Sequence, residues 1–94
     1  MKMDDPPIHK GPKGKVLIVD DAPDTIEIIQ KLLHYEGYDV ITASTGEEGV
    51  KRAEEENPEI VLMDISLPGI DGNEGLRRIR KTNPLVGVII LTAY

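Results

Sequence analysis

Four short runs of apolar residues alternate with longer segments in which apolar residues recur at helical spacing. The runs lie within residues 15–19, 38–43, 60–64 and 86–91. Strands of about five or six residues that alternate with helices of about ten to fourteen residues are typical of βαβ units and a parallel sheet. Because the runs are almost continuously apolar, both faces of the sheet need a cover. The pattern therefore predicts an open α/β fold with helices on both faces.

Residues with known positional preferences mark the ends of the first two helices. We expect the first helix to begin at Pro23 and to end at Gly37, since proline suits the first helical turn and glycine the left-handed position after the last turn. Thr45 and Glu48 have the spacing of a capping box, which predicts the start of a second helix. This helix stops before Pro58.

A third helix is predicted from a second capping-box spacing, at Asp71 and Glu74, and it ends near Thr82. Helical periodicity also predicts which residues of the first helix face the core. The expected buried stripe consists of Ile26, Ile29 and Leu33, flanked by Ile28 and Leu32.

The composition limits the class of protein. The 94 residues suffice for one small domain, and we expect residues 1–14, with three prolines, two glycines and three lysines, to form a disordered leader before a domain at 15–94. The net charge of -6 argues against nucleic-acid binding through this domain, because phosphate backbones are bound by clustered Lys and Arg. The sequence has no cysteine and no apolar stretch that could span a membrane. A cytoplasmic protein without a membrane partner is therefore expected.

Acidic residues stand at the carboxyl ends of two predicted strands. Asp20 and Asp21 follow the first run, and Asp64 closes the third. If these runs are parallel strands of one sheet, the three carboxylates converge at its carboxyl edge, where open α/β sheets bind ligands. At a separation of about 4 Å and an effective dielectric constant of about 20, each pair of like charges costs about 4 kcal/mol. Mg²⁺, which prefers oxygen ligands, is the expected counter-charge.

Three motifs stand at the ends of predicted strands. They are Val19-Asp20-Asp21, then Met63-Asp64 followed by Leu67-Pro68-Gly69-Ile70-Asp71-Gly72, and last Ile90-Leu91-Thr92-Ala93. In order and spacing they resemble the receiver domain of two-component response regulators, over residues 15–94. The resemblance implies a flavodoxin-like open parallel sheet with strand order 2-1-3-4 and helices on both faces. It also implies a signalling domain, not an enzyme.

The resemblance implies a role for each polar residue at this edge. Asp64 would be the phosphoacceptor that takes a phosphoryl group from a histidine kinase, and Asp20 and Asp21 would hold Mg²⁺ together with it. A carboxylate fits this role because it is ionised at neutral pH and needs no base to activate it. The remaining implied groups are the backbone carbonyl of Ser66 as a metal ligand, the hydroxyl of Thr92 as a switch, and the backbone amide of Ala93.

The sequence ends where the family pattern continues through a fourth helix, a fifth strand and a fifth helix. We therefore expect a C-terminally truncated receiver that lacks the fifth strand and the lysine that this strand carries in the family. The run at 86–91 would then be an exposed apolar edge, and such edges recruit other strands. From this we expect a homodimer or a swapped oligomer.

Two other functions fit parts of the pattern. One is an interaction or self-association fragment that does not accept phosphate, an alternative that the missing lysine favours. The other is a Mg²⁺-dependent phosphohydrolase, but such enzymes use an acid–base aspartate two residues after the nucleophile, where Ser66 stands. The phosphoacceptor receiver is the leading prediction.

Overall fold

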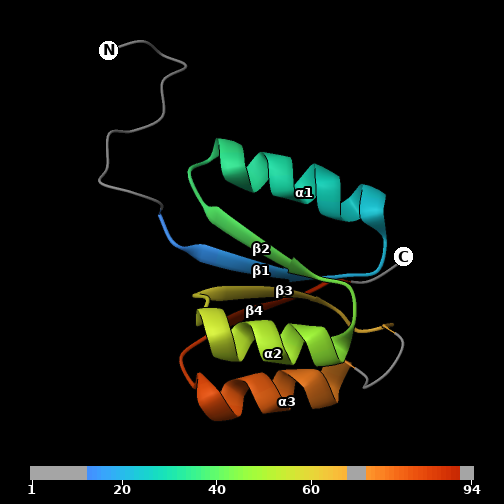
Figure 1. Ribbon diagram of the computed structural model, residues 1–94, viewed down its shortest axis with the longest axis vertical. Coiled ribbons are helices and arrows are strands. Elements are labelled where there is room, and N and C mark those ends of the chain that lie inside the picture. The colour runs from blue at the N-terminus through green and yellow to red at the C-terminus, as the bar shows by residue number, and fades with distance from the viewer. Residues whose placement is uncertain (1–12, 68–71, 92–94) are drawn as a thin grey trace.

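The structure, a computed structural model, describes residues 13–67 and 72–91. The described strands form one parallel sheet in the order β2-β1-β3-β4, with α1 on one face and α2 and α3 side by side on the other (Figure 1). The predicted α/β fold and strand order are confirmed. In chain order the elements are β1 (Lys15–Val19), α1 (Pro23–Tyr35), β2 (Asp39–Ala43), α2 (Gly46–Glu56), β3 (Ile60–Asp64), α3 (Gly72–Thr82) and β4 (Gly87–Leu91).

The helix ends follow the local chemistry of the sequence. Helix α1 begins at Pro23 as predicted, and Gly37 after it has a positive φ of 98°. At the start of α2, the hydroxyl of Thr45 accepts the N–H of Glu48 at 3.1 Å, as the capping box requires. The Glu48 carboxylate accepts the N–H of Ser44 at 2.7 Å, one residue before the expected position. Residues 1–12 of the predicted leader at 1–14, and the predicted cap Asp71, lie outside the described residues.

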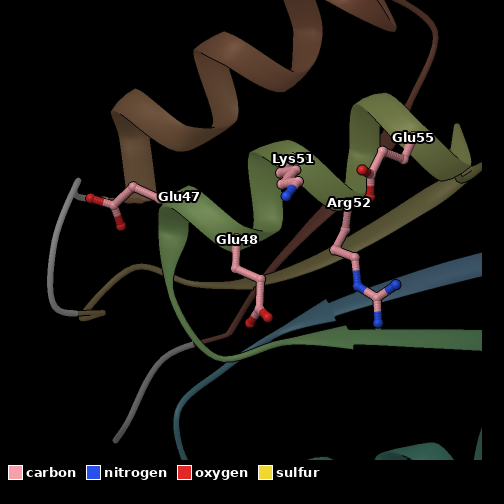
Figure 2. A pocket seen from close by; sticks show the side chains of 5 residues that line it. All are labelled: Glu47, Glu48, Lys51, Arg52 and Glu55. Atoms are coloured by element: carbon pink, nitrogen blue, oxygen red, sulfur yellow. The ribbon is translucent and has the colours of Figure 1, made fainter.

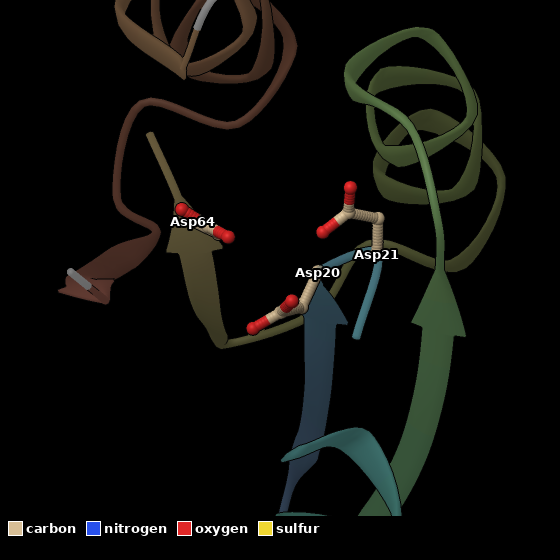
Figure 3. Close-up of side chains that lie close together, drawn as sticks. All are labelled: Asp20, Asp21 and Asp64. Atoms are coloured by element: carbon tan, nitrogen blue, oxygen red, sulfur yellow. The ribbon is translucent and has the colours of Figure 1, made fainter. Parts of the chain in front are cut away.

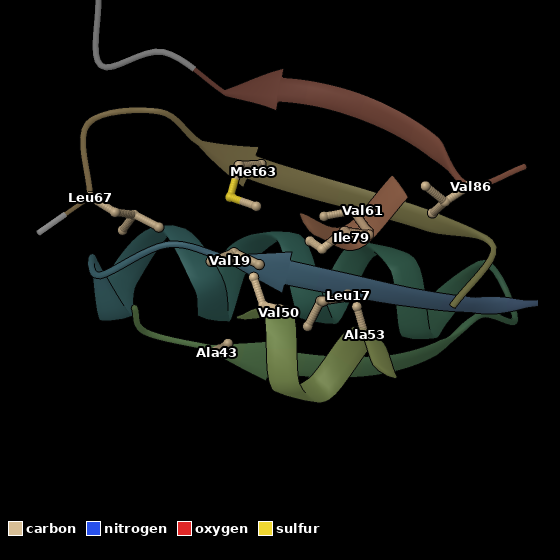
Figure 4. Close-up of a cluster of buried hydrophobic side chains, with 10 residues drawn as sticks. All are labelled: Leu17, Val19, Ala43, Val50, Ala53, Val61, Met63, Leu67, Ile79 and Val86. Carbon is tan, nitrogen blue, oxygen red and sulfur yellow. The ribbon is translucent and has the colours of Figure 1, made fainter. Parts of the chain in front are cut away.

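Apolar side chains of the sheet divide between its two faces. On β1, Leu17 and Val19 join the cluster beneath α2 and α3, whereas Val16 and Ile18 join the cluster beneath α1. The larger cluster consists of Leu17, Val19, Ala43, Val50, Ala53, Val61, Met63, Leu67, Ile79 and Val86 (Figure 4). Both faces of β1 and β3 are buried, so packing holds these two central strands in position. Their carboxyl ends are therefore held at a fixed place at the edge of the sheet.

Helix α1 is less buried than its periodicity predicts. Ile26, Ile29 and Leu33 pack against the sheet, but only partly buried, and none of the helix's residues is fully buried. Ile28 and Leu32, predicted at the edges of the buried stripe, are 61% and 63% exposed. This part of the prediction is wrong, because among the described elements only α1 covers this face, so the flanks of its apolar stripe have no neighbouring helix to pack against.

Helix α2 approaches β1 very closely at Gly49. A Cβ atom placed on this glycine would lie 2.9 Å from Cγ2 and 3.0 Å from Cγ1 of Val19. Real Cβ atoms essentially never come this near to another carbon. The Val19 side chain therefore occupies the space in which a side chain at position 49 would have to fit. The glycine therefore sets the distance between the second helix and the central strand.

An ion pair joins the start of β1 to the end of α2. Nζ of Lys15 lies 2.8 Å from Oε1 of Glu56, and the two side chains are 30% and 35% exposed. The hydrogen bond from Lys15 lowers the pKa of Glu56 below the ordinary 4.5, and the same bond raises the pKa of Lys15 above 10.5. A carboxyl group whose pKa is lower in the folded state stabilises the fold above its unfolded pKa, and this stabilisation is lost as the pH falls through the folded pKa.

We therefore expect Glu56→Gln to melt at a lower temperature than wild type at pH 7, and the difference to vanish on acidification. The variant lacks the ion pair at every pH, whereas wild type loses it only as Glu56 is protonated below about pH 4.5. Thermal melts followed by circular dichroism between about pH 3 and pH 7 measure this difference. A gap in melting temperature that stays constant across the range would contradict the assignment.

Candidate metal and phosphoacceptor site

The acidic residues meet because two neighbouring strands are in matched register. β1 and β3 pair in parallel with Val19 opposite Met63, so the next residues, Asp20 and Asp64, stand at the same height. Oxygen atoms of Asp20, Asp21 and Asp64 all lie within 4.8 Å of one another, and the side chains point toward a common space (Figure 3). Asp20 and Asp64 are buried, at 5% and 9% exposure, and Asp21 is exposed.

Backbone groups hold two of these carboxylates at the strand ends. The N–H of Ala22 donates to Oδ1 of Asp20 at 2.9 Å, and the N–H of Ser66 donates to Oδ1 of Asp64 at 2.9 Å. Each donor is two residues after its acid, at the bend where the chain leaves the strand. Asp64 also accepts the hydroxyl of Ser66, again at Oδ1, at 2.7 Å. Hydrogen bonds of this kind fix the orientation of the carboxylate.

A hollow of about 410 Å³ opens above the three acids. Its lining includes Ser66 and also three residues that sequence reasoning missed: Ala22, Thr25 and Leu91. Ala22 and Thr25 could have been predicted from the sequence. Helix α1 begins directly after the acidic pair, so its first turn must border the same edge of the sheet. Leu91 ends β4, which pairs with β3 so that Leu91 stands opposite Asp64.

The donor set fits Mg²⁺. All three groups are carboxylates, which supply the hard oxygen ligands that Mg²⁺ prefers, and the adjoining hollow leaves room for the waters that the ion keeps. Without a cation, repulsion among these closely spaced, partly buried negative charges would lower the stability of the folded state. Thr92 and Ala93 lie outside the described residues, and the Ser66 carbonyl remains a predicted ligand.

A second hollow, on the outer surface of α2, offers no comparable chemistry. Its lining comes from this single helix, with two acidic residues followed by two basic residues and a further acid along it (Figure 2). The guanidinium of Arg52 donates to the backbone carbonyl of Thr42 at 3.4 Å, so this side chain fastens α2 to β2. The lining residues are Glu47, Glu48, Lys51, Arg52 and Glu55.

Comparison with known proteins identifies the family. The sequence model described as "Response regulator receiver domain" matches residues 16–94, and the chain belongs to this family. Receiver domains are signalling domains rather than enzymes, which confirms the class predicted from the sequence. A curated relative, the alkaline phosphatase synthesis transcriptional regulatory protein PhoP of Bacillus subtilis, is 42% identical over 79 residues, which cover 84% of this chain and 33% of PhoP.

Two solved structures show the same fold. The CheX-CheY-BeF3-Mg²⁺ complex from Borrelia burgdorferi contains a chain 35% identical to this one with a TM-score of 0.79, covering 85% of this chain and 62% of that one. The complex of histidine kinase ThkA with response regulator TrrA contains a chain 41% identical with a TM-score of 0.77, covering 85% and 69%.

The chain spans about a third of the length of the curated relatives it matches, with shares of 33%, 35% and 36%. The activity and partners of a whole protein of this kind are therefore matters for proposal. Within the described ranges, no helix has the length and apolar character needed to cross a membrane.

Addition of Mg²⁺ is expected to raise the melting temperature of the domain. Only the folded chain brings the three acids together, so at ten times the dissociation constant the ion adds about 1.4 kcal/mol to the free energy of unfolding. Differential scanning fluorimetry over a Mg²⁺ titration measures the shift. Asp21→Asn should reduce it strongly, and Asp24→Asn, an exposed acid on α1, should leave it unchanged. Equal shifts in all three proteins would contradict a metal site at this edge.

Proposed function

We propose that the domain at residues 15–94 receives a phosphoryl group on Asp64 from a histidine kinase, with Mg²⁺ held by Asp20, Asp21 and Asp64. The observation that best supports this is the position of Asp64. It is a buried, hydrogen-bonded carboxylate within 4.8 Å of two further acids, at the mouth of an open hollow, in a chain of the receiver family. This combination favours a nucleophile beside a metal site over a structural carboxylate.

The proposed step is an in-line phosphoryl transfer. A carboxylate oxygen of Asp64 forms a bond to phosphorus while the bond from phosphorus to the donor histidine nitrogen breaks, and that nitrogen keeps the electron pair and takes up a proton. A carboxylate nucleophile such as Asp64 needs no general base to activate it. When bound, Mg²⁺ supplies positive charge that offsets the negative charge of the phosphoryl oxygens.

Three further groups have proposed roles that come from the family resemblance. The backbone carbonyl of Ser66 completes the metal ligands. The hydroxyl of Thr92 and the backbone amide of Ala93 donate to phosphoryl oxygens, and the threonine rotates inward to do so. This rotation would connect the phosphorylated site to a change of packing at the end of β4.

A histidine kinase in the cytoplasm is the proposed partner. The solved complex of ThkA with TrrA is a histidine kinase bound to a response regulator that is 41% identical to this chain. The net charge of -6 supports a domain that does not itself bind nucleic acid.

The proposal is tested by incubation with acetyl phosphate and Mg²⁺, followed by intact-mass measurement. Wild type is expected to gain the mass of one phosphoryl group, and addition of a metal chelator should prevent the gain. A wild-type mass that does not change in the presence of Mg²⁺, with the fold intact by circular dichroism, would refute phosphoacceptor function.

The second candidate function is self-association without phosphorylation. The last described strand, β4, has β3 as its partner on one side, and Leu85, Ile89 and Ile90 at or beside it are 94%, 53% and 41% exposed. Exposed apolar residues on an edge strand favour pairing with another strand. Light scattering at micromolar concentration distinguishes the candidates: a homodimer or swapped oligomer that takes up no phosphoryl group would favour the second.

A further inference from the structure

Strand β2 forms one edge of the described sheet, and its only strand partner there is β1. The N–H of Asp39 and the C=O of Ala43 bond to the residues that flank β1. Backbone groups of successive residues in a strand point to opposite sides, so Thr42 and Ser44 direct theirs away from β1. Outward backbone groups of this kind make an edge strand a template for pairing with another chain.

Two of these outward groups have partners on α2. The Glu48 carboxylate accepts the N–H of Ser44 at 2.7 Å, and Nε of Arg52 donates to the C=O of Thr42 at 3.4 Å. Glu48 and Arg52 are four residues apart on the helix and therefore share one face of it, from which both side chains extend toward β2 (Figure 2). They supply the acceptor and the donor that a neighbouring strand would otherwise provide.

We infer that Glu48 and Arg52 form a clamp that closes the carboxyl-terminal half of the β2 edge to a strand from a second copy of this chain. A strand that paired there would need the C=O of Thr42 and the N–H of Ser44, and it would have to displace both side chains. Charged side chains at an edge also discourage pairing, because a second strand would remove them from water. At the start of β2, the exposed Asp39 adds a charge to the same edge.

The clamp limits how copies of the domain can associate. The opposite edge of the described sheet is β4, where Ile89 and Ile90 are exposed. If both edges accepted strands, β4 of one copy could pair with β2 of the next, and head-to-tail contacts of this kind can continue without closing. With β2 closed, strand pairing joins only β4 to β4, which ends at a two-fold dimer. This role of the clamp does not depend on phosphoryl transfer.

The test compares the wild-type chain with the clamp variant, the double substitution Glu48→Ala with Arg52→Met, which removes both bonds. In light scattering over the micromolar range, the molar mass of the clamp variant should be about two-fold or more above that of wild type and should rise with concentration. A second double variant, Glu48→Gln with Arg52→Lys, keeps an acceptor and a donor and should match wild type.

The matched control is Lys51→Met with Glu55→Ala. It removes one base and one acid from the same surface of α2, and among the described residues neither side chain is bonded to β2. Its molar mass should equal that of wild type. Because Glu48 also caps the start of α2, circular dichroism is used to check the fold of the clamp variant. If that variant is unfolded, Arg52→Met against Lys51→Met decides the question in the same way.

Hydrogen exchange locates the surface through which the clamp variant associates. The outward amides of Val40 and Thr42 should exchange more slowly in its oligomers than in wild type at the same concentration, because a neighbouring strand covers them. Equal molar masses for wild type and the clamp variant would overturn the inference. It would also be overturned by equal association of the control, or by slower exchange confined to β4.

Discussion

Replacement of Asp64 by Asn is expected to abolish the phosphoryl adduct. Asparagine has nearly the shape of aspartate, and its carbonyl oxygen can still accept the N–H and hydroxyl of Ser66, which now donate to Asp64 at 2.9 and 2.7 Å. The amide is neutral and is a very weak nucleophile, so the bond to phosphorus cannot form at a useful rate. We expect intact-mass spectra with acetyl phosphate and Mg²⁺ to show an adduct on wild type and none on the variant.

Asp24→Asn is the control for this experiment, because it removes the same charge from an exposed position in the first turn of α1. It should form the adduct at the wild-type rate. An adduct that persists on the Asp64 variant would mean that another side chain accepts the phosphoryl group. The site assignment would then be wrong, although the family would stand.

Gly49→Val is expected to lower the free energy of unfolding by about 3 kcal/mol, out of a total of about 5–15 kcal/mol for a domain. The first added carbon alone would lie 2.9 and 3.0 Å from the two γ-methyl groups of Val19. Val19 has no exposed surface, so it cannot move aside into solvent. Urea unfolding followed by circular dichroism measures the difference as a lower midpoint.

Gly87→Val on β4 provides the matched glycine control. The nearest atom to its added Cβ is the carbonyl oxygen of Glu59 at 3.5 Å, an ordinary contact, and valine suits a strand. This variant should stay within about 0.5 kcal/mol of wild type. In a Val19→Ala background, Gly49→Val should cost much less, because the obstructing methyl groups are gone. A cost that is the same in both backgrounds would rule out the contact as its cause.

The sequence alone was sufficient for the sheet and the acidic cluster. Apolar runs that end in Asp20 and Asp64 predict parallel strands whose ends coincide, and the structure pairs Val19 with Met63 just before them. The convergence of the acids followed from chain direction, which the alternating pattern predicts, and from the strand order, which the resemblance to receiver domains implied. Strand β4 was predicted from Val86 and begins at Gly87, a difference within the usual uncertainty of strand ends.

Features that depend on which side chains meet in three dimensions could not be predicted. Periodicity gave the correct side of α1, but the exposure of Ile28 depends on how much of that face other elements cover. The bond between Lys15 and Glu56 joins residues 41 positions apart and leaves no local signal. The donation of the Ser66 hydroxyl depends on a rotamer, and the pattern of residue types does not specify one.

The pairing of Val19 with Met63 has a consequence beyond the geometry of one site. A slip of a single residue between β1 and β3 would turn every side chain of the moved strand to the opposite face. It would also carry Asp20 away from Asp64 by one residue's rise. Molecules with misaligned or incompletely formed central strands would therefore not react at this site. The fraction of molecules that can react would then equal the fraction in which β1 and β3 are paired in the correct register.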